Sequence, residues 1–403
     1  MTLQWFLSGT VRQATEIWKH VRRLVHHQRD LLSPEGLQAL GAALDRTKAA
    51  LDAHAGKEAL EKQIAELEKV AHQWLQPHPN PAWRENIEVL LVAIAVAMAV
   101  RTFFLQPFKI PTGSMQPTLY GVEYENYDTR PGFLKRVVDG CVGGEFYHEL
   151  IAPADGHVVS VEAKHILRFI NKLNITVDYD NGVRSTETLW FGPEDEAQFA
   201  RKTGFGIGHS FRKGEPIVKT KEIAGDHLFV DRLTYNFRRP ERGEIIVFKT
   251  RGIMDPRTGL PAMDQNQFYI KRMVAMGNER VKIGSDRHLR IDGKRLDAST
   301  PHFENVYNFT ALPQESTYSG HVNGNMRGAD GRPTDYLAPL FPDANAELLV
   351  SPNHYLVMGD NTMNSADSRS WGDFPRGNVI GKSYFVYWPI SNHGHSRFGW
   401  GYR

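Results

Sequence analysis

The distribution of apolar and polar positions divides the chain into a helical first part and a longer part built from short strand-like runs. In the first part apolar side chains recur at helical spacing, as at Ile17 and Val21, which predicts amphipathic helices. Ser33 before Pro34 predicts a new helix start, because serine caps helix N-termini and proline suits the first helical position. We therefore predict a helical N-terminal region over 1–80, arranged as a hairpin. Its first helix is basic, which fits either an anionic membrane surface or ordinary solvent exposure.

The longest apolar run, Val89–Val100, is twelve residues without a polar side chain. Twelve residues are short for a membrane span and suit a buried core helix equally well. Read on to Phe108, the segment becomes twenty residues long, about 30 Å as a helix. Trp83 before it and the phenylalanines at its far end resemble interfacial anchors. We predict one transmembrane helix over 87–108, too far from the first residue to be a cleaved signal peptide.

Beyond this segment the chain consists of short β-branched runs separated by glycine, proline, asparagine and aspartate. Glu244–Phe248 and Tyr355–Met358 are examples, and the texture predicts a mainly β fold with irregular connections. Residues 121–222 contain further turn-then-strand signatures, at Pro153–Val158 and Lys213–Val218. They are predicted to form a self-contained β-rich insert.

Composition narrows the class of protein. The 403 residues carry 48 Lys plus Arg and 46 Asp plus Glu, and a net charge of +2 argues against a nucleic-acid binder. The single cysteine, Cys141, excludes an intrachain disulfide framework and any multi-cysteine metal site. No HExxH motif and no histidine–carboxylate cluster with metal spacing is present, so we expect neither a metal nor another cofactor. A mean hydropathy of −0.42 excludes a multi-span membrane protein.

Three segments carry residues suited to catalysis. Ser114 lies on a short turn between two prolines, although such a turn can also be purely structural. Lys271 lies inside an apolar run beside Tyr269 and Ile270, where a charged amine is costly to bury. Gly359–Gly372 follows a predicted strand and is dense in hydrogen-bonding side chains. Together they suit a serine hydrolase without a catalytic histidine, in which burial lowers the lysine pKa enough for the amine to act as base.

At this point the sequence resembles the bacterial type I signal peptidases, which are Ser/Lys proteases that remove signal peptides from exported proteins. The similarity follows the predicted span and covers roughly a third of the chain. Each matching stretch is weak alone, but their common order makes the resemblance specific. The stretches are Pro111–Met115, Asp231–Lys249, Tyr269–Arg272, Gly359–Arg369 and Gly381–Pro389.

The resemblance implies a role for each matching residue. Ser114 would be the nucleophile and Lys271 its general base. The Ser114 backbone N–H and the Thr112 hydroxyl would form the oxyanion hole, where the family usually has serine in place of threonine. Ser365 would orient the lysine amine. Shallow pockets for small side chains would be lined by Phe108, Ile110, Met115, Leu119, Tyr269 and Ile270.

Asp367 and Arg369 would pair to hold the last loop. The chain departs from the family pattern in that loop, where Thr362 and Met363 replace the usual Arg-Asp. It departs again at Gly277–Glu279, where the family has Pro-Gly-Asp. The connection between the nucleophile and the next matching stretch is also far longer than in the family, and no motif explains it.

The predicted protein is a single-pass membrane serine endopeptidase with a mainly β catalytic domain over 109–120 and 223–403. The resemblance implies that this domain lies outside the bacterial inner membrane, with the N-terminus in the cytoplasm. Its implied partners are signal peptides of exported preproteins, the lipid bilayer and a nearby export translocon. We expect no nucleic acid among its partners. Two alternatives remain open: a membrane-anchored interaction protein built on a degenerate protease core, and a self-cleaving Ser/Lys protease.

Overall fold

The computed structural model divides the chain into two compact units, Met1–Ile94 and Ala95–Arg403. The residues that the structure describes are 9–75, 81–166, 170–190, 192–193, 196–308, 318–328, 331–392 and 394–400.

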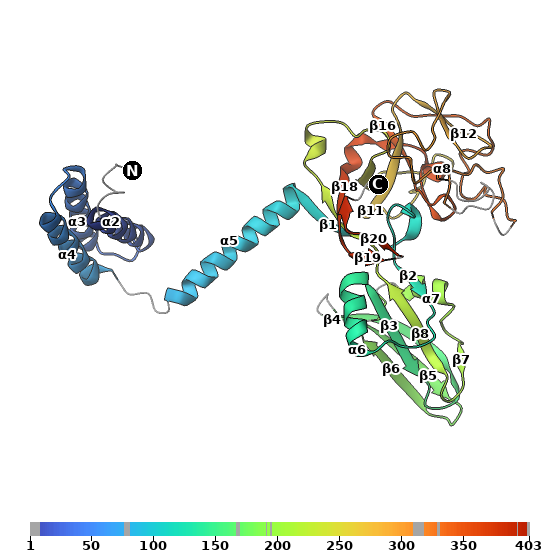
Figure 1. The fold of residues 1–403 in the computed structure, drawn as a ribbon, viewed down its shortest axis with the longest axis horizontal. Helices are drawn as coiled ribbons and strands as arrows, with labels where there is room; N and C mark the ends of the chain where they lie inside the picture. Colours follow the sequence, from blue (N-terminus) through green and yellow to red (C-terminus); the bar gives the residue numbers. More distant parts are fainter. Residues whose placement is uncertain are drawn as a thin grey trace. The chain divides into compact units, whose positions relative to one another are not determined.

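The described residues of the first unit begin with three helices, where the sequence predicted the two of a hairpin. These are α2 (Gly9–His27), α3 (Pro34–Asp52) and α4 (Lys57–Trp74), drawn in dark blue in Figure 1. Ser33 Oγ accepts a hydrogen bond from the Gly36 N–H at 3.2 Å, so the predicted cap starts α3. The apolar stripes of the three helices meet in a shared core that contains Val21, Leu40 and Leu67.

Helix α5 (Pro81–Phe103) contains the long apolar run. Its stretch Glu85–Phe103 is 19 residues with a mean hydropathy of 1.8, and none of it is buried inside the protein. By length and composition this stretch can cross a membrane. The predicted helix over 87–108 was nevertheless too long at its end, because the residues after Phe104 form strand β1 (Leu105–Lys109). Pro107 explains the difference, since proline lacks the helical N–H donor but is tolerated on an edge strand.

The main sheet of the second unit is antiparallel and has the strand order β1-β9-β18-β10-β11-β16-β17, with β21 added beside β18. In β10 the side chains alternate between two buried faces, with Ile245 and Val247 in one apolar cluster and Ile246 and Phe248 in another. Burial on both faces makes the centre of the sheet a rigid support. The remaining bounds are β9 (His227–Asp231), β10 (Ile245–Lys249), β11 (Phe268–Met276), β16 (His354–Met358), β17 (Phe374–Pro375), β18 (Val379–Trp388) and β21 (Gly399–Trp400).

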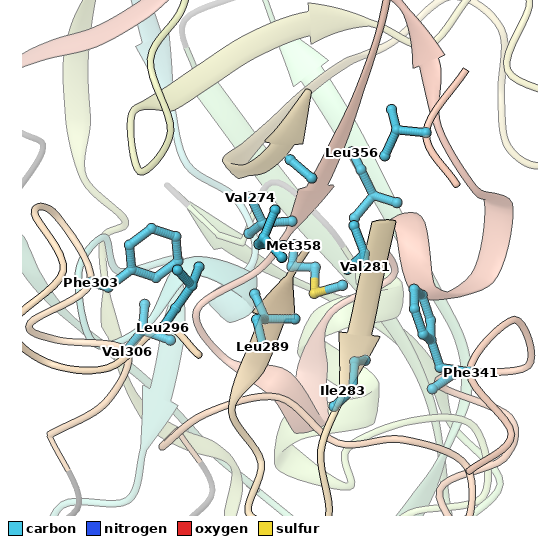
Figure 2. Close-up of a cluster of buried hydrophobic side chains, with 14 of the residues drawn as sticks. Val274, Val281, Ile283, Leu289, Leu296, Phe303, Val306, Phe341, Leu356 and Met358 are labelled. Atoms are coloured by element: carbon cyan, nitrogen blue, oxygen red, sulfur yellow. The ribbon is translucent and has the colours of Figure 1, made fainter. Parts of the chain in front are cut away.

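A second, smaller sheet has the order β14-β13-β12-β15 and packs on the β11–β16 part of the main sheet. Figure 2 shows Val274 of β11 and Met358 of β16 beside Leu289 of β13, within one buried apolar cluster. The bounds of this sheet are β12 (Arg280–Ile283), β13 (Leu289–Ile291), β14 (Lys294–Arg295) and β15 (Leu348–Leu349).

The stretch between β1 and β9 contains two more antiparallel sheets, β2-β8-β3 and β6-β5-β4-β7, drawn mainly in green in Figure 1. They share an apolar core with helix α7, whose Phe199 is fully buried in it. The bounds are β2 (Glu123–Glu125), α6 (Phe133–Val138), β3 (Glu145–Ile151), β4 (Gly156–Ile166), β5 (Ile170–Tyr179), β6 (Arg184–Trp190), α7 (Glu196–Thr203), β7 (Ser210–Phe211) and β8 (Pro216–Ile223).

Short elements complete the fold, and two of them lie at the candidate site. Gly113–Met115 and Thr362–Asn364 are single 3₁₀ turns that contact each other. The others are the 3₁₀ turns Thr234–Asn236 and Arg376–Asn378, the π turn Asp139–Gly143, helix α8 (Ser368–Trp371), and strands β19 (Ser391–Asn392) and β20 (His395–Ser396).

Candidate active site

Ser114 lies on the 3₁₀ turn Gly113–Met115, a few residues after β1, and is buried. Asn361 holds this turn from the loop that follows β16. Its backbone N–H donates to the Ser114 carbonyl oxygen at 3.1 Å, and its Nδ2 donates to the Gly113 carbonyl oxygen at 3.0 Å. These two hydrogen bonds hold the backbone of the turn, and so they help to position the Ser114 hydroxyl, the predicted nucleophile.

Lys271 is the fourth residue of β11, and the structure brings its amine to Ser114. Nζ donates to Ser114 Oγ at 2.7 Å and to the Ile270 carbonyl oxygen at 3.0 Å, although Ser114 and Lys271 lie 157 positions apart. Its side chain is 4% exposed. Burial lowers the pKa of Lys271 to about 8, and nearby Asp367 and Asp360 oppose that shift. An amine with such a pKa is neutral often enough near neutral pH to accept a proton.

A buried ion pair lies next to Lys271 along the same strand. Arg272 Nε and Nη2 donate to the two carboxylate oxygens of Asp360 at 2.7 and 2.5 Å, and both side chains are at most 1% exposed. Thr118 Oγ1 also donates to Asp360, at 2.5 Å. Arg272 and Asp360 lie in two of the stretches that carry the family resemblance, but the sequence alone assigned them no role. One signal could have identified the pair. Arg272 follows Lys271 in an apolar run, and a charge buried there requires a partner of opposite charge.

The predicted pair of Asp367 and Arg369 is present and fully buried. Arg369 Nε and Nη2 donate to the two oxygens of Asp367 at 2.8 and 2.9 Å. Burial would raise the pKa of Asp367, but the Arg369 charge and hydrogen bonds lower it overall. Thr362, a departure from the family pattern, accepts from Arg369 Nη1 at 2.9 Å through its hydroxyl. The departure is thus accommodated within the same network.

Ser365 lies beside the site, and its predicted role of orienting the lysine amine stays a prediction, since among the described residues no hydrogen bond joins the two side chains. Its Oγ is buried, and the hydrogen bonds of the Lys271 amine go to Ser114 and Ile270. Gly359 explains how Ser365 comes so close. A Cβ at this position would lie 2.2 Å from Ser365 Oγ and 2.4 Å from the Ser114 carbonyl oxygen. Only glycine lets the two serines approach through this position.

The six predicted pocket residues divide into two groups. Ile110, Met115 and Leu119 are at most 3% exposed and belong to an apolar cluster on one face of the main sheet. Burial of their apolar surface stabilises the fold, but it leaves them almost no surface to line an open pocket. The others remain partly accessible: Phe108, Tyr269 and Ile270. Among the described residues, no group of three or more metal-ligating side chains could hold an ion.

The loop that carries Ser114 is closed at both ends by one residue, Asp226. Its carbonyl oxygen accepts from the Ile110 N–H at 2.9 Å, and its carboxylate accepts from the Tyr120 N–H at 2.8 Å. Arg397 pairs with that carboxylate and stacks on the Tyr120 ring at 4.3 Å. Thr112 lies within this closed loop, in extended conformation and exposed. Thr112 is thus an exposed residue directly before the turn that contains Ser114.

Comparison with known proteins places the chain in a family. The family model described as signal peptidase, peptidase S26, matches residues 83–138 and 213–388, more than half of the chain, and omits 139–212. A probable signal peptidase I-2 of Synechocystis sp. is 29% identical over 165 residues, covering 41% of this chain and 56% of that protein. Signal peptidase I of Haemophilus influenzae is 26% identical over 371 residues, covering 85% of this chain and 77% of that protein.

The chain also matches solved structures. The crystal structure of a signal peptidase I from Enterococcus faecalis is 22% identical, and the match covers 36% of this chain and 97% of that chain with a TM-score of 0.22.

Proposed function

The chain belongs to the signal peptidase family, peptidase S26, and from that premise we propose that it is a serine endopeptidase that removes N-terminal signal peptides from exported preproteins. The observation that carries the proposal is the 2.7 Å hydrogen bond between the buried Lys271 amine and the Ser114 hydroxyl. Both residues lie within the part of the chain that the family model matches. No histidine is needed, because the burial that lowers the pKa of Lys271 to about 8 supplies a base.

In the proposed reaction the neutral Lys271 amine accepts the hydroxyl proton as Ser114 Oγ bonds to the scissile carbonyl carbon. The carbonyl oxygen becomes an oxyanion, to which the Ser114 N–H and the Thr112 hydroxyl donate. Collapse of this intermediate breaks the peptide C–N bond, and the leaving amine takes the proton from Lys271. Water then attacks the acyl-serine with Lys271 again acting as base, which releases the signal peptide and restores the enzyme.

In this scheme Asp367 and Arg369 hold the loop behind the lysine. Ser365 orients the Lys271 amine. Phe108, Tyr269 and Ile270 provide the accessible apolar surface for small side chains next to the cleavage site. We place the catalytic domain over 109–120 and 223–403 and treat 121–222 as its insert.

We further propose that α5 anchors the protein once in the bacterial inner membrane. The N-terminal helices would then lie in the cytoplasm and the catalytic domain on the outer side, close to the export translocon and the bilayer. A short path supports this, since Ser114 follows the end of α5 at Phe103 by only eleven residues. Confining nucleophile and scissile bond near one membrane plane removes much of the entropy of their encounter.

The deciding experiment measures cleavage of a preprotein and of a signal-peptide substrate by the purified full chain. Ser114→Ala and Lys271→Met are each expected to abolish cleavage while the variants remain folded. Lys249→Met is the matched control, because Lys249 lies exposed on the neighbouring strand β10 and is expected to leave cleavage unchanged. Cleavage retained in Ser114→Ala or in Lys271→Met would refute the proposed mechanism.

A further inference from the structure

Helix α7 reaches the catalytic loop through one buried side chain, Gln198. Its Nε2 donates to the Pro111 carbonyl oxygen at 3.1 Å and to the Val122 carbonyl oxygen at 3.2 Å. Both partners are acceptors, so the side-chain amide must present its NH₂ group to them. Lys202, one turn further along α7, also donates to the Val122 carbonyl oxygen, at 3.3 Å. Helix α7 lies outside the residues that the family model matches, and through Pro111 these contacts join it to the loop that contains Ser114.

The core of its own segment fixes α7 in place. Phe199, the residue after Gln198, is 1% exposed and packs edge-on against Tyr124 of β2 at 5.3 Å and near Phe205 at 5.6 Å. Glu196 accepts a hydrogen bond from the Ala163 N–H of β4 at 3.1 Å. Figure 1 shows α7 beside β2. These contacts place Gln198 on a helix that is packed into the core of its own segment.

The Pro111 carbonyl oxygen, which accepts from Gln198, lies next to Thr112 in the chain. The Pro111 carbonyl belongs to the peptide unit that precedes Thr112, and it also accepts from the Val122 N–H at 3.2 Å. The next peptide unit is confined as well, since a Cβ on Gly121 would lie 2.2 Å from the Thr112 carbonyl carbon. The backbone on both sides of Thr112 is therefore confined, while the residue itself is exposed.

We propose that Gln198 is a positioning residue for the oxyanion hole, through which the 121–222 segment forms a part of the catalytic apparatus. The inference rests on the proposed function, in which the Thr112 hydroxyl donates to the oxyanion. Removing the Gln198 NH₂ group takes away one of the two hydrogen bonds to the Pro111 carbonyl oxygen and leaves the one from the Val122 N–H. The Pro111 peptide unit is then held less firmly, and the Thr112 hydroxyl next to it is positioned less precisely. The substrate still binds, but the transition state loses part of its stabilisation.

The test is steady-state cleavage of a signal-peptide substrate by the full chain carrying Gln198→Met, alone and combined with Thr112→Val. Methionine keeps the side-chain volume and removes both donors. Gln198→Met is expected to lower kcat about 10-fold and to change KM less than about 2-fold, because the contact matters only in the transition state. In the Thr112→Val background it is expected to change kcat less than about 2-fold, since the hydroxyl it positions is gone.

Arg201→Ala, on an exposed position of the same helix, is the matched control and is expected to keep the kcat of the parent chain. If Gln198→Met does not fold, Gln198→Glu serves instead, because it keeps the shape and removes the NH₂ donors. An unchanged kcat, or an equal loss of kcat with and without the Thr112 hydroxyl, would overturn the inference. Failure of the proposed function is a separate result, seen as cleavage by Ser114→Ala.

Discussion

The pH dependence of cleavage tests the chemistry of the site most directly, because it reports the protonation of one buried amine. Burial lowers the pKa of Lys271 from its ordinary 10.5 to about 8, so the neutral form that can act as base is already available near neutrality. At pH 7 about one amine in eleven would be neutral, against about one in three thousand for an ordinary lysine. Burial thus gives roughly 300-fold more active base at that pH.

We expect kcat/KM to rise about tenfold per pH unit below pH 8 and to level off above it, because only the neutral amine accepts the Ser114 proton. The assay is cleavage of a signal-peptide substrate without titrating side chains, in detergent micelles, from about pH 6 to about pH 9.5. Lysine-selective NMR of the Ser114→Ala variant gives the pKa of Lys271 independently. A midpoint above about pH 10, or a rate independent of pH over this range, would refute the reasoning.

Three further predictions concern the groups around the dyad. Thr112→Val is expected to lower kcat about 100- to 1000-fold while Thr112→Ser stays near the parent value, and equal kinetics of the two variants would exclude the hydroxyl from the oxyanion hole. Gly359→Ala places a Cβ 2.4 Å from the Ser114 carbonyl oxygen; it should lower both the melting temperature in calorimetry and the activity, and a fully active variant would contradict this. Asp360→Asn leaves the buried Arg272 charge without its partner, so urea unfolding should report a loss of about 3–5 kcal/mol, and a loss under about 1 kcal/mol would show that the pair contributes little.

The sequence identified the two residues that the structure brings together better than it identified their surroundings. Neither the turn between prolines nor the lysine in an apolar run was decisive alone, and Ser114 and Lys271 received their predicted roles from the family resemblance. Their contact depends on the assembled fold, because β9, β18 and β10 separate β1 from β11 in the sheet, and it is the turn Gly113–Met115 after β1 that contacts β11. The end of α5 was misplaced although Pro107 gave the necessary signal. The prediction followed the apolar side chains and not the proline, but apolar side chains are compatible with a membrane span and with a strand alike.

Other features depend on the assembled fold and leave no local trace. Met115 and Leu119 are apolar residues next to a nucleophile, and sequence alone cannot decide whether such side chains line a pocket or fill the core beneath it. The role proposed for Gln198 is even harder to predict from sequence. It is an ordinary helix residue, and its value arises only because Phe199 and β2 bring α7 against the Pro111 carbonyl oxygen. A contact of this kind has no motif.

The point at which the segment between β2 and β8 leaves the rest of the chain has a consequence for how the protein can be re-engineered. Glu123 of β2 pairs with Ile223 of β8, so the segment departs and returns through one two-stranded stem. A connection whose ends meet tolerates large changes of length, at about 0.6 kcal/mol for each doubling of a flexible loop. The segment is thus topologically removable, and a short turn in its place would leave the strand order of the main sheet intact. Such a trimmed chain would lose Gln198, and also the hydrogen bond that the Cys141 carbonyl oxygen accepts from Trp388 Nε1, so turnover and stability would both report the removal.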